Sequence, residues 1–263
     1  NGAGDVVLTY TFTDLNSCVN SDTMIVSVVA PQVANAGTGF DICVNASIST
    51  LTGFTPSGGS WTGTGVTGNS FNPTTAGVGP HILTYSFGSG TCLSIDTIVV
   101  TVNPLPTITV NSDTICVGQT ATLNASGADT YSWTPNTNLS DTTGASVTAN
   151  PSSTFSYTVT GTNTTTGCVN TAISTVTVNP LPAVNAGASI TLCDQPIAHT
   201  LTGYSPANGV WTGAGVTSGG VFTPNGVGNF LLTYTFTDLS SCTNSDTIVV
   251  TVNPLPIITV NSD

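Results

Sequence analysis

The segment Val-Asn-Pro-Leu-Pro occurs three times in this 263-residue chain, at 102–106, 178–182 and 252–256. Successive copies are 76 and 74 residues apart, and residues 1–29 recur at 225–253 with 19 identical positions. Self-similarity at a fixed period is the signature of tandem domains. We therefore expect domains at 31–104, 105–180 and 181–254, with the C-terminal part of another at 1–30 and the start of another at 255–263.

The repeats are of two kinds. Residues 31–104 and 181–254 share the pattern Gly-x-Trp-Thr-Gly-x-Gly-Val at 59–66 and 209–216, and residues 1–30 match the back half of this first kind. Residues 105–180 form a second kind, whose opening is repeated at 255–263. Both ends fall inside a repeat, which indicates a window from a longer array. Strand exchange between subunits fits less well, because the two end pieces belong to different kinds of repeat.

Each repeat contains strong strand signals. In the segment 96–102, Ile98, Val100 and Val102 share one face, whereas Thr97, Val99 and Thr101 share the other. Clusters of Gly, Asn-Pro and Ser-Gly separate such runs, and no segment shows a convincing helical period. The pattern predicts an all-β protein of tandem immunoglobulin-like β-sandwich domains in an extended array, with Trp133 at a core position.

The charge of the chain excludes several classes of partner. There is no Lys or Arg, all 12 acidic residues are Asp, and the net charge is −12. Binding to nucleic acid or to an anionic membrane surface depends on Lys and Arg. No apolar run approaches the ~18 residues that span a bilayer. We therefore expect no nucleic-acid partner and no membrane insertion of this segment.

The chain resembles the immunoglobulin-like and PKD-like tandem repeats of very large Bacteroidota cell-surface proteins. The resemblance rests on the Val-Asn-Pro-Leu-Pro junctions, on the Gly-x-Trp-Thr-Gly-x-Gly-Val segments and on a Cys116…TPNTNLS…YTVT…Gly167-Cys168 pattern, and it covers the entire chain. It implies export by the type IX system and an association with gliding or adhesion. Repeats of this class serve as scaffolding in many unrelated proteins, so the resemblance identifies the class better than the individual function.

Seven cysteines stand at matching places, one early and one late in each repeat, which predicts a disulfide framework. Metal-binding thiols fit less well, because no two cysteines are close in sequence and none lies beside a His. Disulfides imply an oxidising, extracellular setting at the cell surface. Cys18 aligns with the late cysteines, so we expect its partner upstream of Asn1. The expected pairs within repeats are Cys43–Cys92, Cys116–Cys168 and Cys193–Cys242.

Three other kinds of functional site have weaker support in the sequence. His81 and His199 have no nucleophile or acid partner in any motif, so we expect no enzyme and no cofactor. Trp61 and Trp211, beside glycines, are candidates for stacking on sugar rings, although packing inside a sandwich explains them better.

Calcium is a further alternative, with paired aspartates as hard oxygen ligands. It is disfavoured because the intervening copy keeps Asp96 but has no counterpart of Asp238, and we predict no metal site. The paired aspartates are Asp14 with Asp22 and Asp238 with Asp246.

The resemblance also implies surface O-glycosylation, because Bacteroidota modify Asp-Ser/Thr followed by a small or aliphatic residue. An equally good reading is that Asp-Thr simply begins a strand. Strand parity places the side chains of Thr23, Thr97 and Thr247 on the face opposite the apolar one. The candidate residues are Thr23, Thr97, Thr247, Thr142 and Thr114.

Together these features favour a non-enzymatic structural repeat segment of an extracellular stalk, cell-surface filament or adhesin. Its expected partners are neighbouring repeats of the same chain, other copies in a filament, and surface glycans. The alternative is a polysaccharide-binding module that uses exposed Trp residues.

Overall fold

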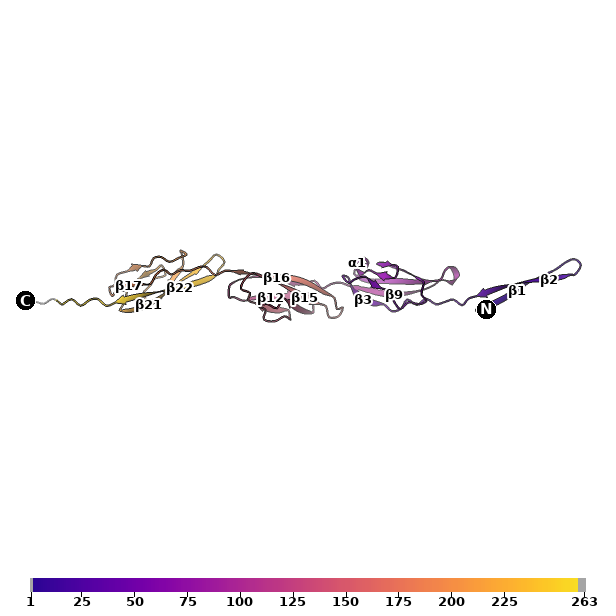
Figure 1. Ribbon diagram of the computed structural model, residues 1–263, viewed down its shortest axis with the longest axis horizontal. Coiled ribbons are helices and arrows are strands. Elements are labelled where there is room, and N and C mark those ends of the chain that lie inside the picture. Colours follow the sequence, from indigo (N-terminus) through magenta and orange to yellow (C-terminus); the bar gives the residue numbers. More distant parts are fainter. Residues whose placement is uncertain (1, 260–263) are drawn as a thin grey trace, which may run out of the picture. The chain divides into compact units, whose positions relative to one another are not determined.

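The computed structural model of the chain describes residues 2–259, so positions 260–263 of the predicted opening repeat lie outside the described residues. Strands dominate (Figure 1), and α1 (Pro73–Ala76) and the 3-10 turn η1 (Gly90–Cys92) are the helical elements of the described part. The all-β prediction is confirmed. Across residues 2–259 no helix is long and apolar enough to cross a membrane.

The first sandwich has a four-stranded sheet in the order β3-β9-β8-β5 and a three-stranded sheet in the order β4-β7-β6. The opening strand runs parallel to the last strand, and the remaining pairs of both sheets are antiparallel. The strands are β3 (Phe40–Cys43), β4 (Ser49–Thr50), β5 (Ser60–Thr62), β6 (Val66–Thr67), β7 (Ser70–Phe71), β8 (Gly79–Phe87) and β9 (Ser94–Asn103).

The second sandwich repeats this plan, with sheets in the orders β11-β16-β15-β13 and β10-β12-β14. Its opening strand of the larger sheet, β11, again runs parallel to its last strand, β16. The strands are β10 (Thr109–Val110), β11 (Asp113–Cys116), β12 (Ala121–Ser126), β13 (Thr130–Thr134), β14 (Ser146–Ala149), β15 (Phe155–Thr162) and β16 (Val169–Asn179).

The third sandwich has sheets β17-β22-β21-β19 and β18-β20, and β17 is parallel to β22. Near the start of the chain, β1 (Gly4–Thr13) and β2 (Val19–Val28) form a hairpin alone. Its register, Gly4 opposite Val28, matches Gly228 opposite Val252 in the third sandwich. The remaining strands are β17 (Ile190–Cys193), β18 (His199–Thr200), β19 (Val210–Thr212), β20 (Val221–Phe222), β21 (Gly228–Thr237) and β22 (Thr243–Asn253).

Three separate apolar cores lie within residues 34–102, 115–176 and 186–252. The alternation expected in β9 is confirmed, because Ile98, Val100 and Val102 are buried whereas Val99 is exposed. Trp133 lies in the second core and donates its indole N–H to the Gly144 carbonyl oxygen at 2.9 Å. These chain segments are therefore immunoglobulin-like sandwiches, each with its own interior.

The chain divides into two compact units. One contains the residues up to 107 together with 127–130 and 161–170, and the other contains the remaining residues. The loop that follows β15 therefore belongs with the first unit, although most of the second sandwich lies in the other. This loop carries Cys168.

Adjacent leucines of β21 provide a test of the third core. Leu232 is fully buried, whereas Leu231 is 61% exposed. We expect Leu232→Ala to lower the free energy of unfolding by about 2–5 kcal/mol, because it leaves a cavity. The matched change Leu231→Ala should stay within about 0.5 kcal/mol. Hydrogen exchange of the β21 and β22 amides measures both, and equal effects of the two substitutions would contradict the assigned facing.

Candidate functional site

Each early cysteine is the last residue of an opening strand that runs parallel to the last strand of its repeat. Cys43 ends β3 opposite Asn103, and Cys116 ends β11 opposite Asn179. Cys193 ends β17 opposite Asn253 in the same way. The early cysteines therefore lie where the last strand finishes, next to the proline junction.

Each late cysteine lies just before the last strand, in the hairpin loop that leads into it. In the third sandwich, one carboxylate oxygen of Asp238 accepts hydrogen bonds from the Ser240 and Cys242 amides, both at 2.8 Å. In the second sandwich, Asn163 accepts from the amides of Thr165 and Thr166 at 3.0 and 3.1 Å. Such side-chain caps stabilise tight loops and fix the position of the cysteine.

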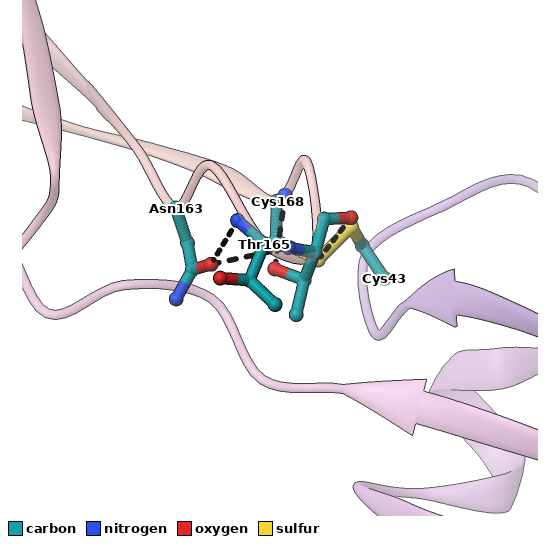
Figure 2. Close-up of a disulfide and its surroundings, with 5 residues drawn as sticks. Cys43, Asn163, Thr165 and Cys168 are labelled. Carbon is teal, nitrogen blue, oxygen red and sulfur yellow. Dashed lines mark hydrogen bonds between the residues drawn. A yellow bond between two sulfur atoms is a disulfide. The ribbon is translucent and has the colours of Figure 1, made fainter.

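Within residues 2–259 there are two disulfides, and both cross a proline junction. Cys43 is bonded to Cys168, with 5.6 Å between their α-carbons and 125 residues between their positions. Figure 2 shows this bond, with the Cys43 strand end on one side and the Asn163 loop on the other. Cys116 is bonded to Cys242 across 126 residues, also with α-carbons 5.6 Å apart. Each bond joins an early cysteine to the late cysteine of the next repeat.

The predicted pairs Cys43–Cys92, Cys116–Cys168 and Cys193–Cys242 are therefore wrong. The reason is the direction of the last strand. In every repeat the late cysteine stands eleven positions before the Asn that faces the early cysteine. Eleven extended residues span ~36 Å, whereas the α-carbons of a disulfide lie within about 7 Å of each other. The two cysteines of one repeat lie at opposite ends of the sandwich.

Cys18, Cys92 and Cys193 are unpaired and exposed. The bonded late cysteines Cys168 and Cys242 are fully buried. Equivalent positions in the repeats thus differ in exposure according to whether the bond is made.

An amide side chain fixes the junction beside each bonded late cysteine. Asn170 donates to the Pro106 carbonyl oxygen at 3.0 Å, and Asn244 donates to that of Pro182 at 2.9 Å. Both asparagines stand two positions after a bonded cysteine. Sequence reasoning missed these two asparagines and the loop-capping Asn163, although Cys-x-Asn at 168–170 and 242–244 was a signal in the sequence. It considered Asp238 only as a calcium ligand.

The tryptophans proposed for sugar stacking lie inside the cores. Trp61 is 6% exposed and Trp211 is 2% exposed. Their rings pack 5.1 Å from Tyr85 and Tyr234 respectively, centroid to centroid. Neither indole offers a free face to a sugar ring, so the stacking interpretation is wrong for both residues.

The aspartates proposed for calcium have other partners in the third sandwich. Asp246 accepts the Ala186 amide at 2.9 Å, which fixes the entering segment against the last strand, and Asp238 caps its own loop. Across residues 2–259 no group of three or more His, Cys, Asp or Glu is placed to hold a metal ion. The backbone hydrogen bond from Ala186, and then that from Thr247, lowers the pKa of Asp246 below its ordinary value of 3.8.

The glycosylation candidates are all exposed. Thr114 neighbours the buried Ile115 on β11, and Thr142 lies in a loop. The exposed set comprises Thr23, Thr97, Thr114, Thr142 and Thr247.

Peptide mapping of the oxidised chain tests the two bonds. Cleavage before Asp gives five cysteine peptides, namely 14–21 with the unpaired Cys18, and 41–95, 113–128, 141–193 and 238–245. We expect two linked species, because Cys43–Cys168 joins 41–95 to 141–193 and Cys116–Cys242 joins 113–128 to 238–245. Pairing within repeats would instead leave 41–95 unlinked and join 113–128, 141–193 and 238–245 into one species.

The carboxylate of Asp246 predicts a pH dependence of stability. Because its pKa is lowered in the folded chain, its contribution is present above 3.8 and is lost as the pH falls below this value. Asp246→Asn should reduce the urea midpoint of the third sandwich near pH 6, and the difference from the native chain should shrink steadily as the pH falls below 3.8. Asp41→Asn, an exposed change of the same charge, is the control. A difference that persists at low pH would contradict the assignment.

Known proteins share little sequence with this chain. No protein-family model matches the chain, and no curated protein sequence matches it. An ice-binding, Ca²⁺-stabilised adhesin of an Antarctic bacterium is 14% identical, with a TM-score of 0.40 over 95% of this chain and 82% of that one.

Two other solved structures are similar at the same level. The eight N-terminal immunoglobulin domains of Down syndrome cell adhesion molecule give 11% identity and a TM-score of 0.38, over 94% of this chain and 43% of that one. A SusE-like surface polysaccharide-binding protein of Bacteroides thetaiotaomicron gives 12% and 0.34, over 96% and 52%. At these scores the likeness carries no argument about function, and the assignment to tandem immunoglobulin-like repeats rests on the sheets and cores of the chain itself.

Proposed function

We propose that the chain is a non-enzymatic structural segment of an extracellular stalk, cell-surface filament or adhesin. The observation that carries this proposal is the pair of disulfides between successive repeats. A single linker leaves two domains free to rotate about it, whereas a second covalent link limits that rotation. Both disulfides thus stabilise the connections between successive repeats.

The two disulfides also add to the stability of the folded repeats. A sandwich of about 75 residues buries a small core and is marginally stable on its own. Closing loops of 125 and 126 residues stabilises the folded chain by about 5 kcal/mol per bond in the chain-entropy account. Such bonds persist in oxidising compartments, which supports an extracellular location at the cell surface.

We propose repeat boundaries at 31–104, 105–180 and 181–254, with parts of further repeats at 1–30 and 255–263. The separate cores support these limits. The resemblance of the junctions and cysteine patterns to repeats of large Bacteroidota surface proteins further supports an origin in that group, export by the type IX system and a role in gliding or adhesion.

A structural role explains His81, one of the two histidines considered for catalysis. His81 uses its ring Nε2 in a 2.8 Å hydrogen bond with the Gly77 carbonyl oxygen, and it packs beside Phe71. One surface cavity, of about 410 Å³, lies over the smaller sheet of the first sandwich. Its lining is Ile48, Gly65, Val66, Thr67, Ser70, Asn72 and Thr75, a set without titratable side chains.

The partners that fit this role are neighbouring repeats, other copies in a filament and surface glycans. Nucleic acid does not fit a chain of charge −12 without Lys or Arg. The rival role, polysaccharide binding through exposed Trp, is not favoured by any observation once Trp61 and Trp211 are buried. O-glycosylation at the exposed threonines stays a prediction.

Small-angle scattering of the oxidised chain tests the stalk. A compact chain of this length has a radius of gyration of about 18 Å. Three sandwiches in line, each with a last strand of roughly 35 Å, require about 30 Å or more. We expect the larger value. Replacing Cys43, Cys116, Cys168 and Cys242 by Ser should shrink and broaden the distance distribution, because the junctions then bend freely.

The matched control replaces the three unpaired cysteines, Cys18, Cys92 and Cys193, by Ser and should leave the scattering unchanged. Circular dichroism confirms that the sandwiches remain folded in both variants. A radius near the compact value for the native chain would overturn the proposal. Equal curves for the bonded and unbonded chains would overturn the bracing role of the disulfides.

A further inference from the structure

The three unpaired cysteines occupy repeat positions that are bonded elsewhere in the same chain. Cys193 ends β17 as Cys43 ends β3 and Cys116 ends β11. Cys18 and Cys92 precede the last strand of their hairpins, as Cys168 and Cys242 do. The same positions thus form disulfides in the sister repeats, and all three sulfurs left over are exposed.

The strand that ends at Cys193 is paired in the same way as the strands that end at the bonded early cysteines. Cys193 faces Asn253, and the following residue, Asp194, donates its amide to the Asn253 carbonyl oxygen at 2.8 Å. The equivalent bonds, from Val44 to Asn103 and from Val117 to Asn179, are both 3.0 Å. The strand pairing at Cys193 therefore matches that at its bonded counterparts. The following turn is tighter, because the Gln195 amide donates to the Cys193 carbonyl oxygen at 2.7 Å, whereas the amides of Ala46 and Gln119 close the turns after Cys43 and Cys116 at 3.0 Å.

The loop of Cys18 likewise matches that of the bonded Cys242. The Asp14 amide donates to the Cys18 carbonyl oxygen at 2.9 Å, and the Cys18 amide donates to the Asp14 carboxylate at 2.8 Å. The corresponding distances for Asp238 and Cys242 are also 2.9 and 2.8 Å. Cys92 differs, because its loop closes through η1, with the Cys92 amide 3.1 Å from the Ser89 carbonyl oxygen.

Both observed bonds follow one rule, which joins an early cysteine to a late cysteine 125 or 126 residues further on. The rule can be applied to the unpaired cysteines by continuing the numbering beyond both ends of the sequence. It assigns Cys193 a late cysteine near position 318, and it assigns Cys92 an early cysteine near position −33. The equivalent position for Cys18 is near −107. No residue of 1–263 meets these requirements.

We propose that Cys18, Cys92 and Cys193 are bonding sites for further repeats, so that the two disulfides belong to a continuous ladder. Cys193 takes the late cysteine of a second-kind repeat, the kind whose opening is present at 255–263. Cys92 takes the early cysteine of the first-kind repeat whose back half is 1–30. Cys18 takes the early cysteine of the repeat before that one. This inference rests on the proposed role as a repeat segment.

Formation of each bond is an oxidation that needs an electron acceptor. The two thiols lose two protons and two electrons to a disulfide oxidant, for which the test uses oxidised glutathione. A thiolate attacks the glutathione disulfide and releases one glutathione thiol. The second cysteine then attacks the mixed disulfide and releases the other.

The test for Cys193 uses the full chain, continued after Asp263 by a copy of residues 114–180, because 255–263 already repeats 105–113. After equilibration with reduced and oxidised glutathione, peptide mapping should link Cys193 to the appended copy of Cys168. Alkylation of Cys193 should be lost, while Cys18, Cys92 and the appended copy of Cys116 still react.

The variant Cys193→Ser of this extended chain separates the ladder from pairing within the appended repeat. The ladder leaves both appended cysteines reactive, whereas pairing within the repeat bonds them to each other and overturns the proposal. Cys92→Ser is the control and should leave all links unchanged. Hydrogen-exchange protection of the appended copies of β15 and β16 verifies that the added repeat is folded.

A second extension tests Cys92. A copy of residues 181–224 placed before Asn1 completes a first-kind repeat, because 1–29 aligns with 225–253. We expect Cys92 to link to the copy of Cys193 and its alkylation to be lost. Reactive Cys92 with a folded added repeat would overturn the ladder at this position. Either failure leaves the scattering result of the unextended chain unaffected, so the stalk and the ladder fail separately.

Discussion

The direction of the last strand in each repeat determines where the sulfurs lie. That strand begins at the late cysteine and ends at the proline junction, and the short opening strand pairs with its final residues in parallel. One cysteine is therefore held at each end of the sandwich. A bond to a neighbouring repeat then requires only that successive repeats follow one another through a short junction, which the Asn-Pro-Leu-Pro sequence provides.

Hydrogen bonds to aspartate carboxylates fix loops and chain segments in this protein, a role that ion pairs share in many other proteins. With no Lys or Arg, the aspartates have no such cation to pair with, and they accept backbone N–H groups instead. Asp246 fixes the entering segment and Asp238 fixes a cysteine loop. Hydrogen bonds from several N–H groups stabilise a carboxylate in its charged form. The cores add a second kind of anchor, because the Tyr85 and Tyr234 hydroxyls each bond backbone groups near a proline.

Much of the fold could be read from the sequence, because period-two alternation reports which face of a strand is buried. Ile98, Val100 and Val102 illustrate this. The disulfide partners could not be read in the same way. Repetition shows that cysteines are equivalent, but it does not show at which end of the sandwich each one lies. That depends on the pairing of the short opening strand, such as Phe40–Cys43, with a strand about 60 residues away.

The interlocked disulfides change how the chain responds to tension. Cys43 and Cys242 are 199 positions apart, yet the shortest covalent path between them passes through both bonds and only the 52 residues from Cys116 to Cys168. Complete unfolding would lengthen that stretch to at most about 180 Å, against roughly 700 Å for the reduced chain. The maximum extension of a segment closed in this way depends on whether its cysteines are oxidised or reduced.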